Sequence, residues 1–220
     1  MVSALPKRRF GPMKIGLIGA QGVGKTTLSK TLLRHYGNAH VVRETVRECP
    51  YPVDTEADFK TEWWVLSHSI LAEQEAREAK HDLIITDRCL LDIAVYTKLI
   101  HNGNPNRMSR VQKKLIEQSI SRWFEDDPYD LIVFLKVDPS VWQSRDLDDG
   151  FRNLDLGWYN ALTTEFEAAL TDFDVASKTS LHHLYNNSSF DSLHSQVVTL
   201  VDNVASEKGY PLKRHMVATL

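Results

Sequence analysis

A glycine-rich segment near the start of the chain has the residue types and spacing that hold phosphate groups. Residues 19–26 match the pattern GxxxxGK[ST], with an apolar run before the pattern and helical periodicity after it. The glycines let backbone N–H groups surround a phosphate, and the start of the following helix adds its positive dipole end. The residues expected to bind a nucleotide here are Gly19, Gln21, Gly22, Val23, Gly24, Lys25, Thr26 and Thr27.

Two side chains of this loop have specific expected roles. Lys25 is expected to bring its charge to the β and γ phosphates of ATP, and Thr26 to place its hydroxyl on Mg²⁺. A glycine-rich turn that binds nothing would leave Lys25 as an unexplained charge at a crowded turn. For Thr27, packing of the helix is the other interpretation.

An acid and an arginine follow the apolar run at residues 83–86. The carboxyl ends of parallel strands are where α/β proteins bind ligands. Asp87 is therefore expected to hold Mg²⁺ through water or to accept a proton, and Arg88 to hold a phosphate or hydroxyl of the substrate. An ordinary ion pair at the end of a strand is the alternative.

Glu44 and Arg47 follow another apolar run and belong to the same predicted edge. Glu44 is the candidate general base for an acceptor hydroxyl, and Arg47 is a candidate clamp on the acceptor. The competing interpretation is a helix-capping glutamate beside a surface arginine.

Two arginines flank an acidic, glycine-containing turn after the run at residues 131–137. Arg145 and Arg152 are expected to belong to a lid, with Arg145 binding the nucleotide and Arg152 supplying positive charge in the transition state. The alternatives are an exposed loop with balanced charges, or pairing of Arg145 with Asp148 or Asp149.

One further pair and one further segment are candidates for binding. Trp64 and His68 lie one helical turn apart and are expected to line an acceptor pocket, although core packing is the common role of such aromatic residues. Residues 186–188 follow the last apolar run, where they form either an adenine-side loop or a plain turn.

The scaffold for these residues is indicated by the apolar pattern. Strand-length apolar runs alternate with helical segments, which predicts an α/β fold with a parallel sheet of about five strands and helices on both faces. The runs lie at residues 14–18, 40–43, 83–86, 131–137 and 181–185. The helical segments lie at residues 25–35, 56–79, 91–100, 110–124, 156–173 and 190–205.

A single domain is expected, because the chain has no repeat, linker or low-complexity tract. Residues 1–206 form the expected P-loop domain, with a lid at 142–155, and residues 207–220 form a C-terminal tail. Asp54 or Thr55 is expected to cap the second helix, and residues 102–106 to form a loop.

Composition excludes several classes of protein. A net charge of −3 and a pI near 6.3 give no overall attraction to nucleic acid or to an anionic membrane. The apolar runs are far shorter than the roughly 20 residues that span a bilayer, so no membrane partner is expected. The two cysteines, without a signal-peptide pattern, predict a cytoplasmic location, and the nine histidines show no metal-ligand spacing.

The residues around the P-loop separate the classes of P-loop protein. A GTPase would carry an Asn-Lys-x-Asp motif after a later strand, and the chain has none. A mechanical ATPase commonly has a strand ending in adjacent acids, whereas the run at residues 83–86 ends in Asp87 and Arg88. A kinase of small molecules is favoured.

The motifs at residues 19–26, 43–47, 87–88 and 148–152 together resemble the AAA-type P-loop kinase family, which includes the ribosylnicotinamide kinase domain and, more distantly, deoxynucleoside and thymidylate kinases. The resemblance implies a nucleoside or nucleotide kinase fold that binds ATP and Mg²⁺, with the acceptor near Glu44 and Arg88 and a lid around residues 145–152. Asp87 departs from the glutamate common in deoxynucleoside kinases, and Cys89 stands where relatives often have serine.

The expected function is therefore transfer of the γ-phosphoryl group of ATP to a nucleoside, a nucleotide or a related small molecule. One alternative is a kinase that acts on hydroxymethylated pyrimidine bases in DNA. The DNA would bind a local basic patch built from residues 7–9, Arg107, Arg110, Lys113 and Lys114. The other alternative is a nucleotide-binding ATPase that regulates without an acceptor.

Overall fold

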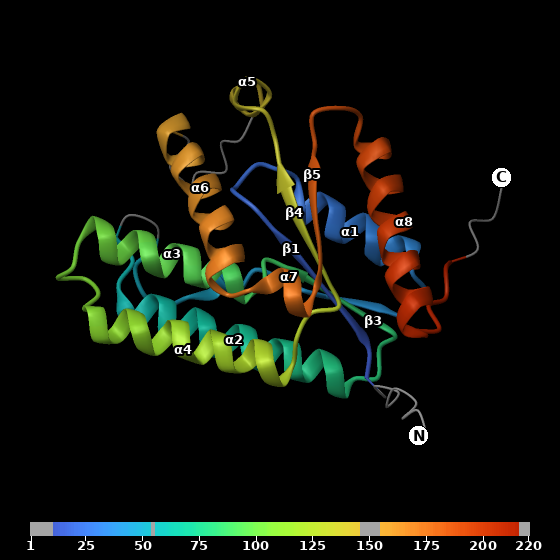
Figure 1. Cartoon of the computed structure of the whole chain (residues 1–220), viewed down its shortest axis with the longest axis horizontal. Coiled ribbons are helices and arrows are strands. Elements are labelled where there is room, and N and C mark those ends of the chain that lie inside the picture. Colours follow the sequence, from blue (N-terminus) through green and yellow to red (C-terminus); the bar gives the residue numbers. More distant parts are fainter. Residues whose placement is uncertain (1–10, 54–55, 146–154, 216–220) are drawn as a thin grey trace.

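Five parallel strands form the centre of the computed structural model, which describes residues 11–53, 56–145 and 155–215. Their order across the sheet is β2-β3-β1-β4-β5 (Figure 1). The strands are β1 (Met13–Ile18), β2 (Ala39–Val42), β3 (Leu83–Asp87), β4 (Leu131–Lys136) and β5 (Ser180–Tyr185). The parallel sheet confirms the α/β class predicted from the alternation of apolar runs and helical segments.

Helices cover both faces of the sheet, because central strands such as β1 are buried along their whole length. One face carries α1 (Lys25–His35) and α8 (Phe190–Lys208). The other carries α2 (Phe59–Glu78), α3 (Leu90–Gly103), α4 (Arg110–Asp126) and α6 (Leu156–Asp172). Three short helices complete the described chain: η1 (Thr45–Glu48), α5 (Pro139–Gln143) and α7 (Val175–Lys178).

Several predicted boundaries differ from the observed ones. The cap of α2 is Asp58, whose carboxylate accepts hydrogen bonds from the backbone N–H groups of Lys60 and Thr61 at 2.8 and 3.2 Å. The prediction of Asp54 or Thr55 as the cap is therefore wrong, and both residues lie outside the described residues. A capping box starts a helix more firmly than either alternative, because Thr61 also accepts from the Asp58 backbone.

Two other helices are longer than expected. Helix α3 continues through Gly103, so the first part of the predicted loop at 102–106 is helical. Helix α8 ends at Lys208, beyond the expected domain boundary at residue 206. The segment after α8 returns to α1, where the Gly37 N–H donates to the Lys213 carbonyl at 2.9 Å.

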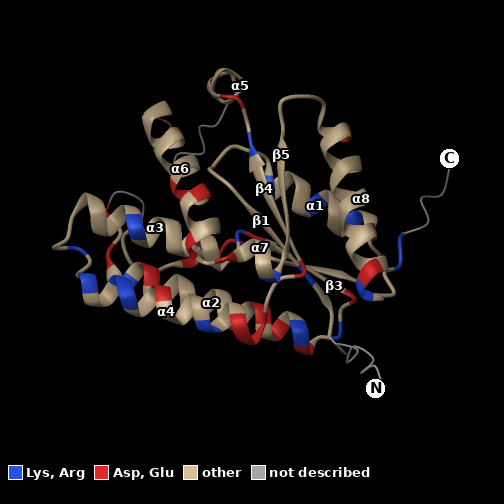
Figure 2. Ribbon diagram, viewed as in Figure 1, with Lys and Arg blue, Asp and Glu red and all other residues tan. Residues whose placement is uncertain are grey.

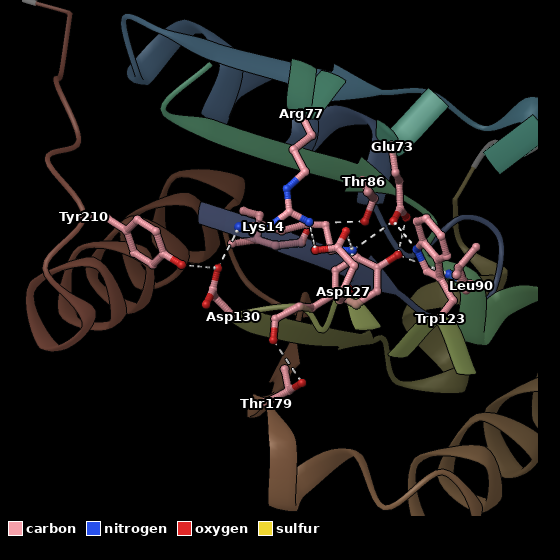
Figure 3. Close-up of polar contacts among 12 residues, drawn as sticks. Lys14, Glu73, Arg77, Thr86, Leu90, Trp123, Asp127, Asp130, Thr179 and Tyr210 are labelled. Carbon is pink, nitrogen blue, oxygen red and sulfur yellow. Dashed lines mark hydrogen bonds and ion pairs between the residues drawn. The ribbon is translucent and has the colours of Figure 1, made fainter. Parts of the chain in front are cut away.

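A buried polar cluster joins the sheet to the helices on one face (Figure 3). Lys14 belongs to the central strand β1, yet its ammonium is buried and lies 3.0 Å from Glu73 of α2 and 2.8 Å from Asp127. The Tyr129 hydroxyl donates to the other Glu73 oxygen, and Trp123 donates to Glu73 at 3.4 Å. Because a buried charge needs opposite charge and hydrogen bonds, this cluster fixes where α2 and α4 lie on the sheet.

Candidate active site

The carboxyl ends of the strands bring segments distant in sequence to one edge of the sheet. The P-loop follows β1, Glu44 follows β2, Arg88 follows β3 and Asn186 follows β5. This is the edge at which parallel sheets bind ligands, so the sequence-based expectation about where these residues meet agrees with their placement.

The P-loop has backbone geometry that two glycines permit. Gly19 has φ of 136°, and a Cβ there would lie 2.3 Å from the Leu135 carbonyl oxygen. Gly24 has φ of 105°, and its Cβ would lie 2.7 Å from the amide nitrogen of Asn186. Both positions therefore exclude larger residues, which keeps the loop tight against its neighbours.

Lys25 lies within the P-loop that it closes. Its ammonium donates to the carbonyls of Gly19 at 2.6 Å and Ala20 at 2.8 Å. Burial and the nearby Arg88 lower the pKa of Lys25 to about 8. This buried ammonium is suited to exchange the two carbonyls for phosphate oxygens when a nucleotide is present.

A second layer of contacts holds the P-loop from outside. Arg145 donates to the Gly22 carbonyl at 2.7 Å and to the Asn186 carbonyl at 2.6 Å, while the Asn186 amide donates to the Val23 carbonyl at 2.9 Å. The Trp142 indole donates to the Gln21 carbonyl at 2.9 Å. Arg145 thus packs against the loop and lines the cleft beside it, and Asn186 does the same.

Two residues could hold Mg²⁺. Thr26 is exposed in the cleft formed by the P-loop, and Asp87 is buried with an Oδ1 atom that has no hydrogen bond among the described residues. Asp87 lines neither cleft described below, but its charge raises the pKa of Lys25. The Asp87 oxygen without a hydrogen bond is suited to accept one from a water molecule bound to Mg²⁺. Contact through water, rather than direct coordination, agrees with the tendency of Mg²⁺ to keep several of its waters.

Glu44 and Arg88 form the central ion pair of the site, with Arg88 Nε 2.6 Å from Glu44 Oε1. Arg88 also donates to the Tyr96 hydroxyl at 3.1 Å and lies 3.8 Å from Asp92. Its backbone has φ of 80°, in the left-handed region that only special sites maintain in residues other than glycine. The surroundings therefore fix the Arg88 guanidinium at the end of β3.

Two clefts meet at this ion pair. One, which we call the nucleotide cleft after the role expected from the sequence, is lined by the P-loop, Arg145, Asn186 and Phe190. The other, called the acceptor cleft on the same basis, lies between α2 and α3, and its apolar wall includes Val42, Val53, Val65, Ile93, Tyr96 and Trp158. Both clefts share only Gln21, Glu44 and Arg88 among their described lining residues, so a group bound in one cleft faces a group bound in the other across these side chains.

Three predicted acceptor residues lie elsewhere. Trp64 and His68 stack on each other with ring centroids 3.7 Å apart, but neither lines a cleft, because α2 turns residues 61, 62, 65, 69 and 73 toward the acceptor cleft instead. Arg47 is half exposed, lies 3.7 Å from Glu44 and lines neither cleft. Arg152 lies outside the described residues.

Sequence reasoning missed the acids of the acceptor cleft. Glu62 and Asp92 are buried there, and burial raises the pKa of Glu62 to about 8 and of Asp92 to about 7. A signal was present for Asp92, because Asp92 and Tyr96 are four residues apart and therefore share one face of α3, and Arg88 lies two residues before that helix begins. The described residues contain no cluster of three or more metal-ligating side chains.

The described helices include none that is both long and apolar enough to cross a membrane. Acids outnumber basic residues on α2, whereas the first turns of α4 gather the basic residues Arg110, Lys113 and Lys114 of the predicted patch (Figure 2).

Comparisons with known proteins agree with this geometry. The chain is similar to NadR in complex with NR at 20% identity and a TM-score of 0.67, over 95% of this chain and 55% of that one, so it spans about half of NadR. It is similar to deoxyadenosine kinase from M. mycoides at 16% identity and a TM-score of 0.65, over 87% of this chain and 100% of that one. It is similar to thymidylate kinase from Candida albicans at 14% identity and a TM-score of 0.61, over 94% of this chain and 99% of that one.

No curated protein matches the chain in sequence. The family model described as "AAA domain" matches residues 14–177. That match begins in β1 and includes the P-loop, Glu44, Arg88 and the buried acids of the acceptor cleft. The chain therefore belongs to this AAA domain family, within the P-loop proteins that have the fold of nucleoside and nucleotide kinases.

Proposed function

We propose that the chain is an ATP-dependent kinase that transfers the γ-phosphoryl group to a hydroxyl of a nucleoside, a nucleotide or a related small molecule. The observation that carries this proposal is the meeting of two clefts at Glu44 and Arg88. Phosphoryl transfer requires mainly that donor and acceptor be positioned and their charge be neutralised, which is what two clefts sharing an ion pair achieve.

Each residue has a defined part in the proposed reaction. Lys25 and the P-loop amides hold the phosphates of ATP, and Thr26 and Asp87 would hold Mg²⁺, which neutralises charge on the phosphates. Glu44 accepts the proton of the acceptor hydroxyl while the acceptor oxygen bonds to the γ-phosphorus and the bond to the bridging oxygen of ADP breaks. Arg88 keeps Glu44 in place and faces the charge that develops on the transferred group.

Radiolabelled ATP offered with free nucleosides, nucleotides and hydroxymethylated duplex DNA tests the proposal. We expect label on a small acceptor, loss of transfer in Lys25→Ala, and at least a hundredfold lower turnover in Glu44→Gln with ATP affinity retained. The matched control is Glu48→Gln, an exposed acid of η1. Wild-type turnover in Glu44→Gln removes Glu44 from the role of base.

The same experiment separates the alternatives. Label on DNA alone would support a kinase of bases in DNA. Release of ADP that no acceptor accelerates would support a nucleotide-binding regulator.

A further inference from the structure

The acceptor cleft contains four carboxylates, and three of them have partners within the protein. Glu44 pairs with Arg88, and Glu73 pairs with Lys14. Asp92 accepts a hydrogen bond from the Cys89 backbone at 3.1 Å and lies near Arg88. Each of these three acids has at least one partner within the protein, although the Oδ1 atom of Asp92 makes no hydrogen bond among the described residues.

Glu62 is the exception. It is 6% exposed and lines the acceptor cleft, yet no described residue donates a hydrogen bond to its carboxylate. It lies one turn before Val65 and two turns before Ser69 on the side of α2 that faces this cleft. Among the described residues, Arg88 is the charge that acts on it, and it does so without an ion pair or a hydrogen bond.

A buried carboxyl group without hydrogen bonds is costly, and the cost remains unless a ligand supplies donors. Burial raises the pKa of Glu62 to about 8 against the opposing effect of Arg88, which reflects that cost. Such unsatisfied groups persist where they serve binding, because a bound molecule that donates to them recovers the lost hydrogen bonds.

The charge of the cleft restricts what can bind beside Glu62. Its described lining holds four acids and two cations, and the cations are Arg43, which is exposed, and Arg88, which is engaged by Glu44 and Tyr96. Beside Glu62, a second phosphate or a carboxylate would meet these acids, because Arg88 is engaged by Glu44 and Tyr96 and Arg43 lies exposed just after β2. A group with N–H or O–H donors would meet complementary acceptors.

We propose that Glu62 selects the acceptor by accepting hydrogen bonds from the part of it that packs against α2, and that this part is uncharged or positively charged. The proposal rests on the kinase function above and narrows its acceptor to a nucleoside-like alcohol with hydrogen-bond donors. An acceptor that already carries a phosphate is disfavoured.

The test compares acceptors that differ at one position in charge and in whether the group there donates or accepts hydrogen bonds. The wild-type chain of 220 residues is given ATP, Mg²⁺ and either 5-aminomethyluridine or 5-carboxymethyluridine, and the common nucleosides are compared with their 5′-monophosphates. We expect kcat/KM for the amino compound to exceed that for the carboxylate by about tenfold or more, and nucleosides to exceed monophosphates. A preference for carboxylates or monophosphates overturns the proposal.

Variants assign the preference to Glu62. In Glu62→Gln and Glu62→Asp we expect the amino-to-carboxylate ratio to fall at least fivefold through a higher acceptor KM, while the KM for ATP stays within about twofold. The matched control is Glu75→Gln, an exposed acid on the same helix, which should keep the wild-type ratio. An unchanged ratio in both Glu62 variants overturns the role of Glu62.

Thermal unfolding distinguishes recognition from a structural role. Because Glu62→Gln removes a carboxyl group that is buried without hydrogen bonds, its Tm should equal or exceed that of the wild type. A lower Tm together with an unchanged acceptor preference would show that Glu62 serves folding instead. The proposed function itself fails only if wild-type protein labels no acceptor, an outcome separate from a changed or unchanged ratio.

Discussion

At the scale of single residues, the site depends on side chains whose orientation is fixed by several contacts. Arg88 contacts an acid that follows β2 and a hydroxyl and an acid of the next helix, α3, while its backbone occupies the left-handed region. A planar fork with several donors can make these contacts together, and a lysine ammonium cannot. A positive charge at position 88 is therefore not sufficient, because the position also requires the several donors of a guanidinium.

Arg88→Lys should therefore lower kcat about a hundredfold or more while the protein still folds, because Glu44 loses the contact that orients it. A steady-state assay at saturating ATP measures the effect. Arg47→Lys is the matched control, since Arg47 is half exposed and lines neither cleft, and its turnover should stay within about twofold. Equal effects of the two substitutions would contradict the assigned difference between them.

The residues that sequence alone identified differ in kind from those it missed. The P-loop could be predicted because a phosphate fixes both its glycines and its spacing. Glu44 and Arg88 could be predicted because strand ends converge on one edge. Glu62 could not be predicted, because what marks it as a candidate binding residue is burial without a hydrogen bond, which the sequence does not reveal. Trp64 was predicted to line the acceptor pocket instead, although α2 turns it away from the cleft.

At the scale of elements, the acceptor cleft depends on how α2 and α3 lie against the sheet. The Lys14 cluster anchors α2 at Glu73, one residue of the same face that lines the cleft (Figure 3). The capping box at Asp58 fixes where α2 begins. Sequence periodicity predicted the helix but not this anchoring. Glu73 and Asp127 are separated from Lys14 by 59 and 113 positions in the sequence, so these contacts exist only in the folded chain.

Lys14→Met should lower the free energy of unfolding by about 3–5 kcal/mol, because Glu73 and Asp127 would remain buried without their cation. In the Glu73→Gln background the same substitution should cost less, and the difference is the coupling energy. Urea unfolding of the four proteins of the cycle measures it. Lys113→Met, which removes a surface pair with Glu117, should change stability by less than about 1 kcal/mol.

Additive costs in this cycle would contradict a coupled pair. They would also show that the pairing of Lys14 with Glu73 does not hold α2 in place.

At the scale of the whole molecule, the nucleotide cleft joins the start and the end of the fold. The P-loop follows the first strand, Arg145 follows α5, and Asn186 follows the last strand, yet all three are linked by hydrogen bonds around the loop. The overall charge of −3 provides no general attraction to a polyanion, so binding must come from this local geometry. Because these segments separate when the chain unfolds, a ligand bound in the cleft should bind the folded protein and stabilise it.

ATP with Mg²⁺ at about 100 times its Kd should therefore raise the free energy of unfolding by about 2.7 kcal/mol, and Tm by roughly 5–10 °C for a chain of this size. Lys25→Ala should lose most of this shift, and Asp87→Asn should lose the part that depends on Mg²⁺. Lys30→Ala, an exposed lysine of the same helix, should keep the full shift. If Lys25→Ala keeps it as well, the nucleotide does not bind at the P-loop, and the assignment of the two clefts fails at its first step.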